Sequence, residues 1–166
     1  MSTENQTVES VKPAAGFKTI LWSGLVAGIL DGVAAIIVLH AWYKLTPSQV
    51  MQWIASGAYG AAAFTGGTST IIAGIFFHFV VAYVLAVIYF FAFPKIKFLS
   101  ARPVLSGLLF GLGIFLVMNL LVIPASNIQR SPFDPGLAAV SIIWHMLLVG
   151  LPISLITKKY YAGTNA

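Results

Sequence analysis

The sequence predicts an all-α membrane protein, a four-transmembrane-helix bundle, from two observations. Charged residues make up 8% of the chain and hydrophobic residues 59%, whereas soluble domains average about 25% charged residues. A soluble domain of 166 residues has too small an interior to bury so much apolar surface. In addition, four apolar stretches can each cross a bilayer core of about 30 Å at about 1.5 Å per residue. These spans are residues 20–39, 71–93, 104–123 and 137–156.

The second span shows best where the chain meets the membrane surface. Its apolar run from Ile71 to Phe93 contains one strongly polar residue, His78, and is followed by Pro94-Lys95-Ile96-Lys97. A proline and two lysines directly after a long apolar run mark the return to water on a positively charged side.

The segments outside the spans have distinct compositions. Residues 1–16 are polar and predict a disordered tail, residues 161–166 predict a second tail, and residues 17–160 form the transmembrane domain. Thr46-Pro47 is a helix-start signal, and the apolar residues after it recur at helical spacing to Ser56, which predicts a short helix lying in the membrane interface. The connection between the last two spans, Pro124 to Pro135, contains three prolines and predicts an extended, solvent-facing cap.

The basic residues predict the orientation of the chain. One side of the membrane would hold seven of the nine, and the other side only Lys44 and Arg130. Basic residues concentrate on the cytoplasmic side, so both termini should be cytoplasmic. The net charge of +5 would suggest nucleic acid binding in a soluble protein, but here it follows from topology, and no nucleic-acid partner is expected. The seven are Lys12, Lys18, Lys95, Lys97, Arg102, Lys158 and Lys159.

The chain contains a candidate internal repeat of two helices. The pattern Ser-Gly-Leu-x-x-Gly occurs at residues 23–28 and again at 106–111, and Ile-x-x-His occurs at residues 75–78 and 142–145. Two helices return the chain to its starting side, so a duplicated pair would be parallel, related by an axis along the membrane normal. Chance similarity between apolar helices is the alternative.

Small residues at a spacing of four predict close helix packing. In a bilayer, glycine stripes let helix backbones approach each other, because packing replaces the hydrophobic drive that is missing in lipid. The stripe would serve the bundle itself or the seam of a homodimer. Its members are Gly24, Gly28, Gly32, Gly107 and Gly111.

Four polar residues at membrane depth form a candidate ligand or proton site. Counted from the outer ends of their spans, Asp31, His78 and His145 all lie about 12–14 Å below the surface. Charged groups at this depth face inward and find partners, so the three would form one site if their helix faces converge. Asp31 and His78 are expected to interact. Asn119, near the outer end of the third span, would bond across helices or border this site.

Three interpretations of these residues remain open. The groups could bond to one another and serve only the bundle, as in a structural or stress-related membrane component. They could bind a small solute or protons, since histidine titrates near physiological pH. Alternatively, His78 and His145 could ligate haem b, since imidazole is a haem ligand.

The remaining features exclude several classes of site. The chain has no cysteine, which excludes disulfides, zinc–thiolate sites and covalent haem attachment. It has no nucleophile–base motif, no His-Glu-x-x-His and no phosphate loop, so we expect no enzyme activity. The short loop with Lys95, Lys97 and Arg102 should contact anionic lipid headgroups.

Several features follow one another in a fixed order around the string Phe-Pro-Lys-Ile-Lys at residues 93–97. A histidine-bearing helix comes before this string and a Gly-Leu-Leu-rich helix comes after it. Pro-Phe-Asp at 132–134 then precedes a last helix with His145. In these features the chain resembles the YagU-like uncharacterised inner-membrane proteins of bacteria. The resemblance covers roughly residues 71–159 and implies a bacterial inner-membrane location, with no established reaction. Asp31 lies outside it, so the resemblance lends that residue no support.

Overall fold

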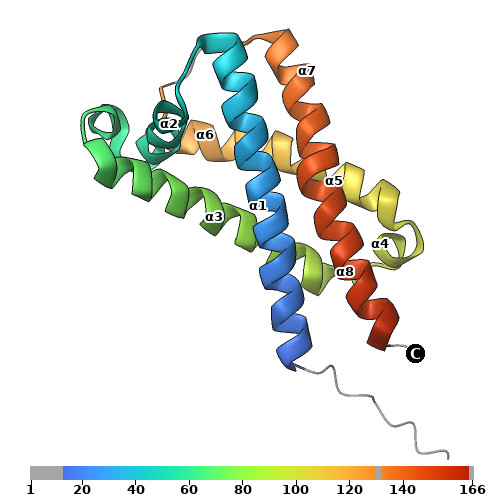
Figure 1. Cartoon of the computed structure of the whole chain (residues 1–166). Coiled ribbons are helices and arrows are strands. Elements are labelled where there is room, and N and C mark those ends of the chain that lie inside the picture. The colour runs from blue at the N-terminus through green and yellow to red at the C-terminus, as the bar shows by residue number, and fades with distance from the viewer. Residues whose placement is uncertain (1–12, 130–131, 165–166) are drawn as a thin grey trace, which may run out of the picture.

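The computed structural model of the protein describes residues 13–129 and 132–164, and all of its regular elements in these ranges are helical. Four helical segments are long and apolar enough to span a membrane, which confirms the predicted fold class (Figure 1). Three predicted spans lie wholly within one of these segments, and the span 71–93 extends one residue beyond its segment. The predicted tail lies outside the described residues up to position 12, and its last four residues belong to the first helix. The four segments are Ala14–Tyr43, Gly67–Ala92, Pro103–Ala125 and Pro135–Gly163.

The first and second spans, α1 (Pro13–Tyr43) and α3 (Gly67–Ala92), pack through glycine. A Cβ atom added at Gly24 would collide with the ring of Tyr83, and one added at Gly28 would lie 2.8 Å from the ring of Phe79. The aromatic side chains of α3 therefore fill the groove that the glycines of α1 leave open. Such contacts supply the van der Waals packing that holds helices together in lipid.

The third and fourth spans approach each other even more closely. Gly107 and Gly111 of α5 (Pro103–Val117) face the last span, which consists of α7 (Pro135–Trp144), η3 (His145–Gly150) and α8 (Leu151–Thr164). A Cβ atom at Gly111 would overlap the carbonyl group of His145, and one at Gly150 would overlap that of Gly107. The backbones of α5 and of the last span are therefore in direct contact.

The two halves use equivalent residues for these contacts. The alignment that pairs residues 23–28 with 106–111, and 75–78 with 142–145, also pairs the glycine contacts of the first half with those of the second. The repeat seen in the sequence is thus repeated in the packing. The equivalent contacts are Gly24–Tyr83 with Gly107–Gly150, and Gly28–Phe79 with Gly111–Met146.

Two π-helical segments interrupt the second half, and each ends two residues before a proline. The segment η2 (Met118–Val122) leads into α6 (Ile123–Ala125), which contains Pro124, and η3 leads into α8, which contains Pro152. In both cases the residue before the proline donates its backbone N–H to the carbonyl five residues back. A proline ring would clash with the carbonyl four residues back in a regular helix. Widening by one residue relieves this clash and keeps the backbone hydrogen-bonded inside the membrane.

The predicted short helix is present as α2 (Pro47–Tyr59), followed by a 3-10 turn, η1 (Gly60–Phe64). Thr46 and Gln49 form a reciprocal capping box at its start. The helix packs on α3 so closely that a Cβ atom at Gly74 would overlap the carbonyl of Met51.

The described residues of the connection between the last two spans are mostly exposed, as predicted, and the connection is also bonded to α2. The backbone N–H of Asn127 donates to Gly57 O at 3.1 Å, and its side-chain amide donates to Ala58 O at 3.2 Å. Pro124 and Ala125 belong to helix α6 instead of the loop. The carbonyl groups at the end of α2 need donors, and the loop supplies them.

At the opposite end, beside the short helix α4 (Lys97–Ala101), a buried hydroxyl network joins three helices. The Tyr89 hydroxyl donates to Ser154 Oγ at 2.7 Å and lies 2.8 Å from Ser106 Oγ. Ser154 Oγ in turn donates to Pro103 O at 2.6 Å. All three side chains are buried, so their hydrogen bonds have no competing water.

A matched pair of Tyr→Phe variants tests this network. Tyr89→Phe removes two buried hydrogen bonds and should cost about 1–3 kcal/mol of stability. Tyr160→Phe is the control, because the Tyr160 hydroxyl is buried without a hydrogen-bond partner in the described part of the chain. It should be neutral or stabilising. The measurement is the midpoint of thermal unfolding in detergent, and equal losses in both variants would contradict the assignment.

Candidate functional site

Asp31, Trp144 and His145 meet between α1 and the junction of α7 with η3; we call them the Asp31 cluster. The indole Nε1–H of Trp144 donates to Asp31 Oδ1 at 2.9 Å. His145 Nε2 lies 3.9 Å from the same oxygen, which is an ion-pair distance and too long for a direct hydrogen bond. Two ring nitrogens from the last span thus converge on one carboxylate oxygen of the first.

The second ring nitrogen of His145 fixes its tautomer. His145 Nδ1 lies 2.7 Å from Ser141 O, and because a carbonyl only accepts, Nδ1 must carry hydrogen. In the neutral ring Nε2 is then an acceptor, and it faces a carboxylate oxygen, which is also an acceptor. The cluster therefore places a ring nitrogen of His145 and a carboxylate oxygen of Asp31 3.9 Å apart, so that the two groups form an ion pair when the histidine carries a proton.

Neighbouring rings hold the imidazole in place. The Trp144 ring stacks on it with centroids 5.1 Å apart and an interplanar angle of 21°, and Phe115 meets it edge-on at 6.0 Å. The side chains of His145 and Asp31 are 14% and 24% exposed. The cluster is thus preorganised and still reachable, which a site that exchanges protons requires.

A π-helical turn begins at His145. The segment η3 starts at this residue and ends two residues before Pro152. The Ser141 carbonyl accepts from both the backbone N–H and the side chain of His145. Single π-helical turns of this kind are frequent at functional sites.

His78 lies at the level of Asp31 on α1 but meets a different face of that helix. Its Nε2–H donates to Gly28 O at 2.8 Å, and Gly32 lies beside the same ring. This face is roughly a quarter turn around the helix from Asp31. Because two glycines expose the backbone here, the imidazole bonds to a carbonyl group. In the described residues the ion-pair partner of Asp31 is His145, so the expected Asp31–His78 pair is not formed.

Asn119 does not reach the Asp31 cluster. It is exposed, and its side-chain amide donates to Phe115 O in its own helix at 2.9 Å. The residue lies in η2, where the widened turn disturbs the regular backbone pattern. Its hydrogen bond repeats that of His145, since both side chains bond to the carbonyl four residues back.

The two membrane-depth histidines do not fit a haem as they lie. Nε2 is occupied by Gly28 O in His78, and it faces Asp31 in His145. A six-coordinate haem would need both rings turned toward a shared space. No step is derived through this group.

Trp144 is the member of the site that sequence reasoning missed. The signal that points to it is that an indole N–H at membrane depth requires a hydrogen-bond acceptor. Counting acceptors near that depth would have pointed to Asp31, the carboxylate of the first span.

A second Trp–Asp pair lies at the outer end of the same two helices. Trp42 Nε1–H of α1 donates to Asp134 Oδ2 at 2.9 Å, and Asp134 Oδ1 accepts from the backbone N–H of Leu137 at 2.9 Å. These bonds, first that of Leu137 and then that of Trp42, lower the pKa of Asp134 from its ordinary 3.8. The pair is the mirror of Asp31–Trp144, because α1 supplies the tryptophan here and the acid there.

Comparison with protein-family models, curated proteins and solved structures finds no match to this chain. The resemblance to the YagU-like proteins therefore stays a prediction, and the function must be inferred from the geometry of the site.

The lowered pKa of Asp134 in the Trp42–Asp134 pair predicts that the contribution of this pair to stability depends on pH. The folded-state pKa of Asp134 is lowered, so its carboxylate stabilises the fold fully above the unfolded-state value of 3.8, and this contribution is lost as the pH falls through the lower folded-state value. The difference in thermal midpoint between the parent and Asp134→Asn should therefore shrink in acid. Because all other carboxyl groups are common to both proteins, they cancel. A difference that is constant with pH would contradict the prediction.

Proposed function

We propose that this protein is a multi-pass protein of the bacterial inner membrane that handles protons, or a small solute in exchange for protons, at the Asp31 cluster. The observation that carries the proposal is the fixed orientation of His145. Its Nδ1–H is committed to Ser141 O while Nε2 faces Asp31 Oδ1 at 3.9 Å. A proton bound by His145 would make the two groups an ion pair between two spans of the bundle.

The chemistry follows from what each state requires. With the proton bound, His145 and Asp31 attract each other, and Trp144 donates to the carboxylate. When the proton leaves, two acceptors face each other in a medium of low dielectric, where an unpaired polar group is costly. Either the helices separate, or another donor enters. A solute with an N–H or O–H donor, or with a positive charge, would replace the proton at Asp31.

Trp144 is a built-in reporter for this proton. A protonated imidazole stacked on an indole makes a cation–π contact, so the fluorescence of Trp144, isolated by subtracting the Trp144→Phe variant, should change in one step through the range where histidine titrates. His145→Gln should abolish the step, and Asp31→Asn should alter it, because the carboxylate that faces Nε2 of His145 is then absent.

His78→Gln is the matched control. It removes an imidazole at the same depth that bonds to Gly28 O, and glutamine can keep a donor there, so the Trp144 step should persist. A pH-independent Trp144 signal in the parent would overturn the proposal and favour a structural role for the cluster.

The orientation of the chain is tested separately. The start of α1 and the end of α8 lie at the same end of the bundle, where residues of both line one cavity. The sequence predicts that seven of the nine basic residues lie on this side. A C-terminal fusion should be active with a reporter that works only in the cytoplasm and silent with one that works only in the periplasm. Fusions that end the chain after Gln129, between α6 and α7, should give the opposite pattern. Periplasmic activity of the C-terminal fusion would contradict this orientation.

A further inference from the structure

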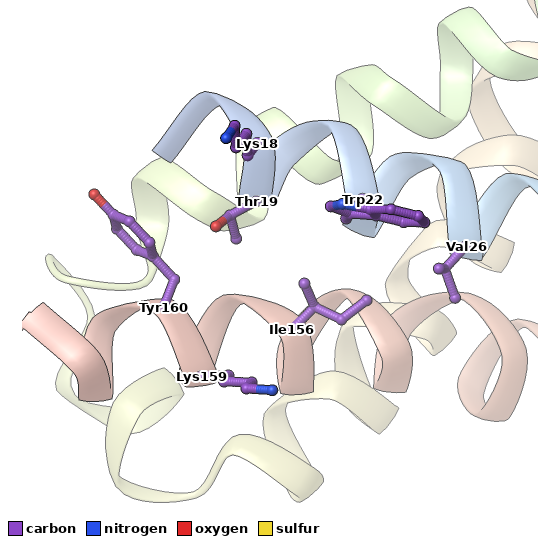
Figure 2. Close-up of a pocket in the computed structure, with 7 residues that line it drawn as sticks. All are labelled: Lys18, Thr19, Trp22, Val26, Ile156, Lys159 and Tyr160. Carbon is purple, nitrogen blue, oxygen red and sulfur yellow. The ribbon is translucent and has the colours of Figure 1, made fainter. Parts of the chain in front are cut away.

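A cavity of about 390 Å³ lies between the first turns of α1 and the last turns of α8. Figure 2 shows Thr19, Trp22 and Val26 of α1 facing Ile156 and Tyr160 of α8, with Lys18 and Lys159 at its borders. None of the residues that line this cavity belongs to the Asp31 cluster.

The lining changes character along the length of the cavity. Lys18, Trp22 and Val26 follow one another at a spacing of four, which places them in one stripe about 12 Å long on α1. On the antiparallel α8, Lys159 lies toward the chain end and Ile156 lies deeper. The cavity is thus cationic at the membrane surface, aromatic at the level of the interface, and aliphatic below it.

The two lysines at the cationic end have no carboxylate partner. In the described part of the chain the one ion pair joins Asp31 and His145, and the residues that line the cavity include no acid. Lys18 and Lys159 are both exposed, and Trp22 between them and the apolar part is 61% exposed. Among the described residues, an anion is the group that this end lacks.

The other side of α8 has a groove of the same construction. Arg102 and Lys158 lie at its border, and Val104, Leu105 and Leu108 line the remainder. Neighbouring lysines of α8 therefore serve two different grooves, each with two cationic residues above an apolar wall.

We propose that the cavity between α1 and α8 binds an anionic phospholipid of the surrounding bilayer. The phosphate would lie between Lys18 and Lys159, and an acyl chain would follow Trp22, Val26 and Ile156. A free phosphate ion would satisfy the lysines and leave the apolar wall exposed, whereas a zwitterionic lipid would cover the wall and bring no net negative charge. Only an anionic lipid complements both ends.

Trp22 allows a direct test in vesicles of phosphatidylcholine that contain, at equal mole fraction, either phosphatidylglycerol or phosphatidylcholine brominated near the top of the acyl chain. Bromine quenches indole fluorescence on contact, and the Trp22 signal is obtained by subtracting the Trp22→Phe variant. Phosphatidylglycerol should quench Trp22 more strongly than phosphatidylcholine does. Since a lysine near the membrane surface contributes about fivefold to the preference for an anionic lipid, Lys18→Gln and Lys159→Gln should each lower the preference by about this factor.

Lys158→Gln is the matched control, because it removes the same charge from the neighbouring residue, which lines the other groove. It should leave the quenching of Trp22 unchanged. A loss equal to that of Lys159→Gln would show diffuse attraction to a charged surface and would overturn the site. Equal quenching by both lipids in the parent, or relief of quenching by added inorganic phosphate, would likewise overturn the proposal.

Discussion

The structure depends on one constraint, which is that a backbone polar group at membrane depth must find its partner within the protein. Pro124 and Pro152 each remove a donor from a spanning helix, and each is preceded by a widened turn that restores the pairing. The same constraint explains why side chains bond to backbone carbonyls at this depth, as His78 does to Gly28 and His145 to Ser141. The positions of these polar side chains thus depend on which backbone groups are available for hydrogen bonds.

The Asp31 cluster gains its rigidity from the two mirrored Trp–Asp pairs. Asp31 and Trp42 lie about 16 Å apart along α1, and their partners, Trp144 and Asp134, lie a similar distance apart on α7. Two helices joined at two points cannot rotate independently. The acid of the Trp42–Asp134 pair has a lowered pKa, so it stays ionised, and able to accept from Trp42, at a more acidic pH than an ordinary aspartate.

The four spans, the short outer helix and the glycine positions could be predicted because each depends on local spacing that the sequence displays. The partner of Asp31 could not. Depth follows from counting residues, and it correctly placed His78 and His145 level with Asp31, but the direction of a side chain depends on the turn geometry before Pro152, which depth counting ignores. Asn119 shows the same limit, since its hydrogen bond lies within the disturbed turn before Pro124. The cavity between α1 and α8 is lined by residues near both ends of the chain, and no spacing pattern in the sequence could predict that these residues meet.

The alignment of the two halves has a consequence for how such a site could arise. It pairs Asp31 with Ile114 and Trp144 with Phe77, so neither half contains both the acid and the indole donor. The site exists only across the boundary between the halves, and a single half, alone or as a symmetric dimer, would need both residues in every copy. The Asp31 cluster therefore depends on positions at which the two halves differ.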